Sequence, residues 1–194
     1  LGVHGGALPD FLEVVLSRLA HMLALGVLCA AMSAAPSIAA PPLSAQLSGQ
    51  WVLAESPDEV RAHVDQAIEV AVEPMPRAFR LFARPALRKH ATSCDEVFLE
   101  LDGHTITRQC DSKAPLTRRL DNSEGAIVGK DGKPCEVDVA VDRFSVQLSF
   151  QNTEGGQRDH YRAEVGDTLV VTHELYAPQL PEDLVWSVRY RRVK

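Results

Sequence analysis

The chain has 194 residues, of which 45% are hydrophobic and 24% charged, a composition that fits one folded domain and excludes a disordered chain. Its formal net charge of −6 provides no general attraction to nucleic acid. The sequence also contains no glycine-rich phosphate loop, zinc-finger spacing or RNA-binding signature. We therefore expect no nucleic-acid partner, no metal and no cofactor.

Residues 1–40 are predicted to be a signal peptide with an upstream segment. Residues 22–35 form an uninterrupted run of apolar and small residues, with Arg18 before it and small residues up to Ala40 after it. A positive flank, an apolar centre and a small-residue exit are the three parts of a secretory signal. The run is shorter than the roughly 20 residues of a membrane helix; a short anchor or a buried helix is the alternative. We expect cleavage near Ala40, a periplasmic or secreted protein, and one domain over residues 41–194.

The mature chain is predicted to begin with a short strand over residues 49–55 and to continue with two helices. Ser56 and Glu59 complete a capping box at the start of the first helix. Apolar residues recur along that helix at helical spacing, which predicts one buried face: Val60, Val64, Ala67, Ile68 and Ala71. A second helix is predicted over residues 76–90, and Pro85 is expected to kink or split it.

The second helix carries two sets of side chains that bear on function. Four arginines fall three or four residues apart and form a basic stripe: Arg77, Arg80, Arg84 and Arg88. A charged helix face is usually just solvated, but this stripe also suits transient contact with an anionic membrane surface. In the second interpretation, Phe79 and Phe82 on the same helix face the ligand cavity.

From residue 94 onward the hydrophobic period changes to two, which predicts strands joined by tight turns such as Asp102-Gly103. The predicted strands cover residues 96–101, 104–110, 115–120, 125–130, 137–141, 144–150, 158–165, 168–176 and 184–192. With the first strand they give about ten strands, so the fold class is mainly β in an antiparallel up-and-down order. Such a meander removes its exposed edges by closing into a barrel, whose interior has room for one small ligand.

Residues 47–56 read LSGQWVLAES, a Gly-x-Trp strand that is followed at once by the helix pair. This opening is similar to that of the calycins, the lipocalins and fatty-acid-binding proteins, and the helix pair makes it resemble the fatty-acid-binding side. The resemblance implies a ten-stranded β-barrel with a two-helix lid, here about residues 57–90, although this helical segment is longer than the family's lid. Gly49 would allow close passage of the backbone and Trp51 would plug the barrel floor; a core tryptophan of another β fold is the alternative.

Pairing across the first hairpin predicts which side chains point inward. A two-residue turn at Asp102-Gly103 would place Leu99 opposite Ile106 and Val97 opposite Arg108, so Arg108 shares the inner face. A buried arginine needs a carboxylate or a ligand anion, unless it lies near the rim and reaches solvent. The same parity places six more side chains inside: Val137, Val139, Phe144, Val146, Leu148 and Phe150.

On the last strand, alternate positions share one face: Leu184, Trp186, Val188 and Tyr190. The resemblance implies an Arg-x-Tyr pair here that holds a fatty-acid carboxylate. Tyr190 matches the tyrosine, but Val188 stands where the arginine belongs, so that anion site is broken while an apolar ligand stays compatible. Arg189 and Arg191 are expected to point outward, and one of them to cover Trp51.

Three cysteines remain after the predicted cleavage: Cys94, Cys110 and Cys135. Cys94 and Cys110 flank one hairpin, so a disulfide between them is compatible with an oxidising compartment. Strict parity, however, pairs Cys110 with Asp95, and the disulfide would need a bulge or a frayed strand end. No pair of cysteines has the close spacing of a metal site.

The leading hypothesis is therefore an exported, non-enzymatic protein that carries a small apolar or lipid-like ligand. No nucleophile–base pair is evident, so no catalytic residue is assigned. The alternatives are a small calycin-type enzyme, such as an isomerase or synthase, and a protein-interaction module whose barrel is filled by its own side chains. The residues predicted to contact ligand are Phe79, Phe82, Leu99, Ile106, Arg108, Val146, Leu148, Phe150 and Tyr190.

Overall fold

The computed structural model describes residues 41–129, 132–165 and 167–194. The predicted signal peptide, its cleavage point at Ala40 and the residue pair 130–131 lie outside the described residues. The described chain forms one compact unit, Pro41–Lys194. None of the helices in these ranges combines the length and the apolar character that crossing a membrane requires.

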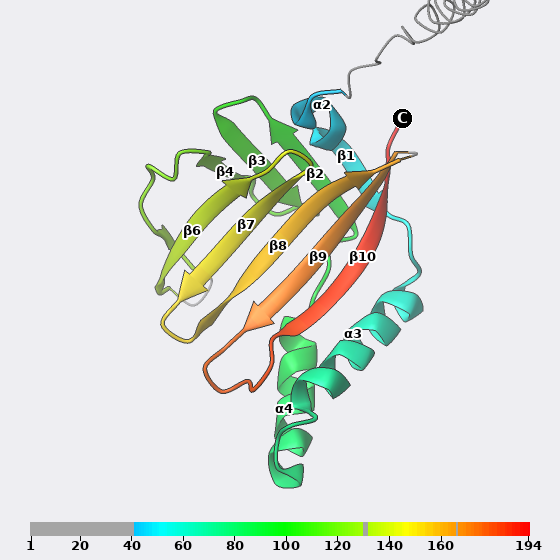
Figure 1. Ribbon diagram of the computed structural model, residues 1–194, viewed down its shortest axis with the longest axis vertical. Helices are drawn as coiled ribbons and strands as arrows, with labels where there is room; N and C mark the ends of the chain where they lie inside the picture. The colour runs from blue at the N-terminus through cyan, green and yellow to red at the C-terminus, as the bar shows by residue number, and fades with distance from the viewer. Residues whose placement is uncertain (1–40, 130–131, 166) are drawn as a thin grey trace, which may run out of the picture. The chain divides into compact units, whose positions relative to one another are not determined.

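Ten antiparallel strands form one curled sheet (Figure 1), which confirms the predicted fold class. The strands are β1 (Gly49–Leu53), β2 (Glu96–Leu101), β3 (Thr105–Cys110), β4 (Leu116–Arg119), β5 (Ile127–Val128), β6 (Pro134–Val141), β7 (Ser145–Asn152), β8 (Gly155–Glu164), β9 (Thr168–Tyr176) and β10 (Leu184–Arg192). Strands that are neighbours in sequence pair with each other except β4 and β5, and β1 also pairs with β10. Along β2 buried and exposed residues alternate strictly, as the period of two requires.

The expected closure into a full barrel is not made by backbone hydrogen bonds, because the sheet order ends at β4 on one side and at β5 on the other. Side chains bridge these edges instead. The buried Arg118 of β4 donates to the carbonyl oxygen of Val137 in β6 at 3.3 Å. The Asn122 amide donates to the carbonyl oxygen of Val139 at 3.0 Å and accepts from its N–H at 2.7 Å, as a neighbouring strand would.

Within the described residues, three helices accompany the sheet: α2 (Leu43–Leu47), which was not predicted from the sequence, α3 (Pro57–Val72) and α4 (Arg77–His90). The predicted capping box is present, since the Ser56 side chain accepts from the Glu59 N–H and the Glu59 carboxylate accepts from the Ser56 N–H. Pro85 does not split the helix, one of the two effects predicted for it, because α4 continues through it. Proline removes only one helical hydrogen bond there, and arginine contacts on both sides of Pro85 hold the helix against α3.

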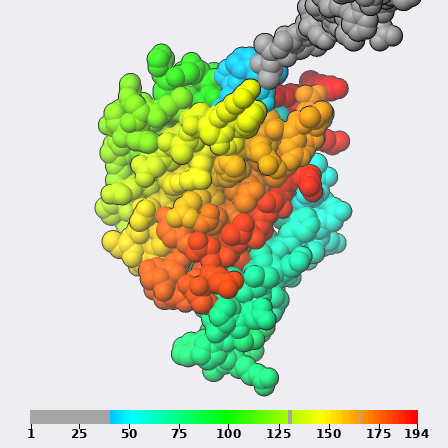
Figure 2. All heavy atoms as spheres, viewed as in Figure 1, coloured from blue at the N-terminus to red at the C-terminus, as the bar shows by residue number. Residues whose placement is uncertain are grey.

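The helix pair flanks the sheet rather than closing it. β1 pairs only with the last three residues of β10, Tyr190 to Arg192. α3 lies beside the rest of β10 (Figure 1). Four buried side chains of α3 join the core: Val64, Ile68, Ala71 and Val72. A helix over an otherwise bare strand edge protects that edge from unwanted pairing. The residues of α4 project beyond the strands (Figure 2).

The first hairpin has a longer turn than predicted. Leu99 lies opposite Arg108 and Leu101 opposite Ile106, a shift of two residues from the expected register. The cause is the Asp102 side chain, which accepts hydrogen bonds from the N–H groups of His104 and Thr105 and so builds a wider turn. Because the shift is two residues, each side chain keeps its predicted face.

Cys94 and Cys110 form a disulfide, with Cα atoms 5.5 Å apart. Cys110 lies opposite Val97, not Asp95, because of the register shift. Cys94 precedes β2 and belongs to residues 91–95, which connect α4 to the sheet. The disulfide therefore ties this connection to β3, and no strand bulge is needed.

Candidate functional site

The inner face of the curled sheet is packed with the side chains that the sequence placed there. Leu99, Ile106, Val146, Leu148 and Tyr190 are buried in the core, and Phe150 is half-buried against it. Phe144 is the exception, because it is exposed in the turn between β6 and β7. There its N–H donates to the Asp142 carboxylate, and the Arg143 guanidinium lies over its ring, so the strand begins one residue later.

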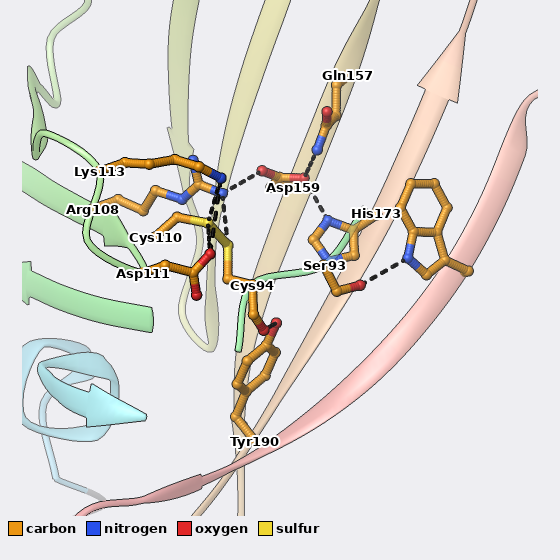
Figure 3. A network of polar contacts seen from close by, with 11 residues as sticks. Ser93, Cys94, Arg108, Cys110, Asp111, Lys113, Gln157, Asp159, His173 and Tyr190 are labelled. Carbon is orange, nitrogen blue, oxygen red and sulfur yellow. Dashed lines mark hydrogen bonds and ion pairs between the residues drawn. A yellow bond between two sulfur atoms is a disulfide. The ribbon is translucent and has the colours of Figure 1, made fainter. Parts of the chain in front are cut away.

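Residues 91–95 border this interior, with Ala91 and Cys94 buried in the core, and contacts of Ser93 and Cys94 hold the segment in place (Figure 3). The disulfide fixes Cys94 to β3. The Tyr190 hydroxyl donates to the carbonyl oxygen of Cys94 at 2.9 Å, and the Trp186 indole donates to the Ser93 hydroxyl at 3.2 Å. Tyr190, predicted to contact ligand, is thus engaged with the backbone of this crossing segment.

A buried cluster of polar side chains lies on three strands around Asp159 (Figure 3). Asp159 of β8 and His173 of β9 are 1% and 2% exposed, and their Oδ1 and Nδ1 atoms are 2.7 Å apart. Arg108 of β3 approaches the other Asp159 oxygen with its Nη2 at 3.4 Å, and Gln157 donates to Oδ1 at 2.7 Å. The predicted inward Arg108 therefore finds a carboxylate, the partner that a buried arginine needs.

Three atoms of this region are buried without a hydrogen-bond partner among the described residues: Arg108 Nε, Tyr161 Oη and His173 Nε2. Buried polar atoms are almost always paired, with protein groups, ordered water or a ligand. Leaving one unpaired costs about 1–3 kcal/mol. The cluster is consequently a place where a small polar group would be stabilised.

The electrostatics fix the charge of the cluster. Burial opposes ionisation of Asp159, but the hydrogen bond from His173 and the charge of Arg108 outweigh it, so the pKa of Asp159 lies below its usual value. Burial, with the negative charge of Asp159 nearby, raises the pKa of the Tyr161 and Tyr190 hydroxyls above their usual value. Near neutral pH the cluster thus holds one carboxylate, one guanidinium and two protonated phenols.

This arrangement is not prepared for nucleophilic catalysis. A carboxylate–histidine pair activates a serine, threonine or cysteine that hydrogen-bonds to the second imidazole nitrogen. In the described part of the chain, His173 Nε2 has no such partner. Its ring instead stacks on Trp186 with the centroids 4.9 Å apart.

Gly49 and Trp51 lie at the end of the sheet where β1 meets β10. Trp51 is 1% exposed, and its indole donates to the carbonyl oxygen of Leu47 at 2.9 Å. Arg192 covers the ring, with its guanidinium carbon 4.2 Å from the centroid, so the prediction that Arg189 or Arg191 does this was wrong. Arg192 is the residue opposite Trp51 in the register. Gly49 has φ +144°, and a Cβ there would lie 2.7 Å from Arg192 Nη1.

The expectation that Phe79 and Phe82 face an inner cavity is contradicted. Their side chains are 66% and 78% exposed on α4. They line a groove on the outside of the domain, of about 470 Å³, with Met75, Ala83 and Gln179 among its other residues. The physical reason is that α4 packs on α3 instead of over the mouth of the sheet.

Most arginines of the predicted basic stripe are already bound to other groups of the protein. Arg84 forms two hydrogen bonds with the Glu69 carboxylate, at 2.8 and 2.7 Å. Arg88 donates to Asp65 at 2.8 Å, and Arg80 donates to backbone carbonyl oxygens between the helices. The stripe therefore fastens α4 to α3, an alternative that neither sequence interpretation included.

The cluster residues Asp159, Tyr161 and His173 were missed by the sequence analysis. They share the inward parity of β8 and β9, alternating with outward residues such as Arg158 and Arg162. This alternation was visible in the sequence. The sequence did not show that β3 and β8 approach each other across the curled sheet, where Arg108 contacts Asp159.

No protein-family model and no curated protein matches the chain. Among solved structures it is similar to a Schistosoma mansoni fatty acid binding protein in complex with arachidonic acid, at 15% identity and a TM-score of 0.47, over 78% of this chain and 99% of that one. The Caenorhabditis elegans lipid binding protein 8 gives 12% identity and a TM-score of 0.48, over 79% and 100%. The REP1-NXSQ fatty acid transporter gives 14% and 0.46, over 77% and 98%. Similarity at this level carries no argument about ligand, and the fold assignment rests on the strand order described above.

Proposed function

We propose that the protein is an exported binding protein that carries a small apolar or lipid-like ligand on the inner face of the curled sheet. The observation that carries this proposal is the set of buried unpartnered atoms, Arg108 Nε, Tyr161 Oη and His173 Nε2, within an otherwise apolar interior. An apolar lining with a few convergent polar groups is typical of a small-molecule site.

We expect ligand entry to require a shift of residues 91–95, because Ala91 and Cys94 of this segment belong to the buried core. The hydrogen bonds from Tyr190 to Cys94 and from Trp186 to Ser93 would be exchanged for contacts with the ligand. The disulfide limits how far Cys94 can move and keeps the segment tethered near β3. The ligand thus replaces a tethered segment rather than filling a preformed void.

The test is a native mass spectrum of the protein purified from its own host without detergent. We expect a co-purifying small molecule that organic solvent extracts, and a smaller bound fraction in Tyr161→Phe. Tyr176→Phe, which alters a half-buried tyrosine of β9, is the matched control. An apo mass for the wild-type protein would contradict the carrier and favour the interaction module with a filled interior.

We further propose that α4 makes transient contact with a membrane surface through its exposed apolar residues Phe79, Leu81 and Phe82. Three exposed large apolar side chains on one projecting helix form an unusual surface for a soluble domain. Arg77 remains exposed beside them, whereas Arg84 and Arg88 are neutralised by α3 carboxylates. Aromatic insertion would therefore contribute more than the arginine charges.

Sedimentation with anionic phospholipid vesicles tests this contact. The double variant Phe79→Ser and Phe82→Ser should lose binding, while Phe144→Ser, which removes an exposed phenylalanine elsewhere, should keep it. Arg77→Gln should weaken binding less, and mostly at low salt. Equal sedimentation of all variants would refute the proposal.

A further inference from the structure

The atoms around Asp159 can be sorted by what each still offers to a ligand. Arg108 already has its charge matched by Asp159, at 3.4 Å, and keeps one N–H free at Nε. The Tyr161 hydroxyl is protonated, because burial raises its pKa, and so it can donate a proton as well as accept one. Arg108 and Tyr161 also lie close enough to interact with each other, so one donor remains for a ligand on this side of the cluster.

His173 supplies the complementary group. The Asp159 carboxylate lies 2.7 Å from Nδ1, which assigns the proton of a neutral imidazole to Nδ1 and leaves a lone pair on Nε2. His173 Nε2 is thus a buried, unpartnered acceptor.

From this inventory of one free donor and one free acceptor, we infer that the cluster recognises an uncharged hydroxyl-bearing amphiphile, such as a long-chain alcohol, rather than a fatty-acid anion. A hydroxyl can accept from Arg108 Nε or Tyr161 Oη and donate to His173 Nε2. A carboxylate has acceptors only, so it would face the Nε2 lone pair. It would also add a second negative charge next to Asp159, with no free cation to match it.

The assignment rests on the proposed function and deepens it, because it names the polar end of the ligand. It also agrees with a difference between this chain and the fatty-acid-binding proteins that it resembles. Their pattern has an arginine where this chain has Val188. Val188 is fully buried, and Tyr190 is bound to the backbone of Cys94. The face of β10 therefore offers no group for a carboxylate.

The experiment compares dodecanol with dodecanoate, two probes with the same alkyl chain, by titration at neutral pH. The tryptophan fluorescence of the protein reports binding, because the Trp186 indole stacks on His173. We expect dodecanol to bind at least about tenfold more tightly, a difference of one decade in Kd. Tyr161→Phe should weaken dodecanol binding by roughly threefold to tenfold, as the loss of one hydrogen bond does, and Tyr176→Phe should not change it.

The possible results distinguish the hydroxyl assignment from the proposed interior site. Equal or tighter binding of dodecanoate, with loss in Tyr161→Phe, would overturn the hydroxyl assignment but leave a carrier. Failure of both probes to bind, or binding that Tyr161→Phe leaves unchanged, would overturn the assignment together with the proposed interior site.

Discussion

Asp159 is the residue on which the polar cluster depends, since it accepts from His173 and Gln157 and pairs with Arg108. Arg108 and His173 come from β3 and β9, and Gln157 lies two residues before Asp159 on β8. The carboxylate is 1% exposed, so its ionisation is sustained by these neighbours and not by water. Removing its charge leaves Arg108 without a counter-ion in a buried place.

We expect Asp159→Asn to destabilise the protein by about 3–5 kcal/mol, the usual effect of breaking a buried ion pair. Urea unfolding at neutral pH measures it. Glu164→Gln is the matched control, because Glu164 lies on the same strand and pairs with Arg162 at the surface. The control should change stability by less than about 0.5 kcal/mol. Equal effects of the two substitutions would contradict the role given to Asp159.

The same carboxylate predicts a dependence of stability on pH. The pKa of Asp159 is lower in the folded chain than in the unfolded chain, where it is about 3.9. Its contribution to stability is therefore complete above that value and is lost as the pH falls through the folded-state pKa. Urea midpoints measured from about pH 6 downward should fall more steeply below pH ~4 in the wild type than in Asp159→Asn. Parallel profiles would count against this assignment.

At the scale of single elements, α4 depends on α3 for its position. Arg84 binds the Glu69 carboxylate with two hydrogen bonds, and Arg88 binds Asp65, so the arginines act as fasteners between the helices. The apolar residues Phe79 and Phe82 contribute little to this packing, because most of their surface is exposed. α4 should consequently open before the strands do.

Glu69→Gln is expected to speed amide hydrogen exchange over residues 77–90 and to leave the exchange of the strands unchanged. The reason is that the substitution removes the charge that holds Arg84 and loosens only the α3–α4 contact. Glu73→Gln, which changes a carboxylate just beyond α3, serves as the control. Exchange in α4 that is the same in all three proteins would contradict the fastening role.

At the scale of the whole molecule, the sequence predicted what local patterns determine. Periods of two and 3.6, turn residues and the capping box of Ser56 and Glu59 located nearly every strand and both long helices. The register of the first hairpin was wrong by two residues, because the Asp102 side chain builds a turn that the Asp-Gly pair alone does not specify. Local patterns therefore predicted the face of the sheet on which a side chain lies more reliably than the residue opposite it on the next strand.

Contacts between distant segments could not be predicted in the same way. The Arg108–Asp159 pair joins β3 to β8, and the Asn122–Val139 bridge joins two edges that share no ladder. Both depend on how strongly the sheet curls, which no local spacing encodes. The placement of α4 outside the mouth likewise follows from its ion pairs with α3, and these pairs join residues 15 and 23 positions apart.

The disulfide acts on the molecule as a whole, because it links the segment entering the sheet to β3 across 16 residues. Cys94→Ser together with Cys110→Ser should lower the free energy of unfolding by about 3 kcal/mol, the value for a loop of this length. Thermal and urea unfolding measure the loss. Unchanged stability would show that the side-chain ties to Ser93 and Cys94 alone hold this segment.

The account's central claim is that an amphiphile binds inside the curled sheet with its polar end at the Asp159 cluster. A high-resolution crystal structure of the protein grown with dodecanol tests it most directly. We predict elongated density that replaces part of residues 91–95 and ends within hydrogen-bond distance of Tyr161 Oη and His173 Nε2. Ordered water alone on those atoms, or an alkyl chain confined to the outer groove beside Phe79 and Phe82, would contradict the claim.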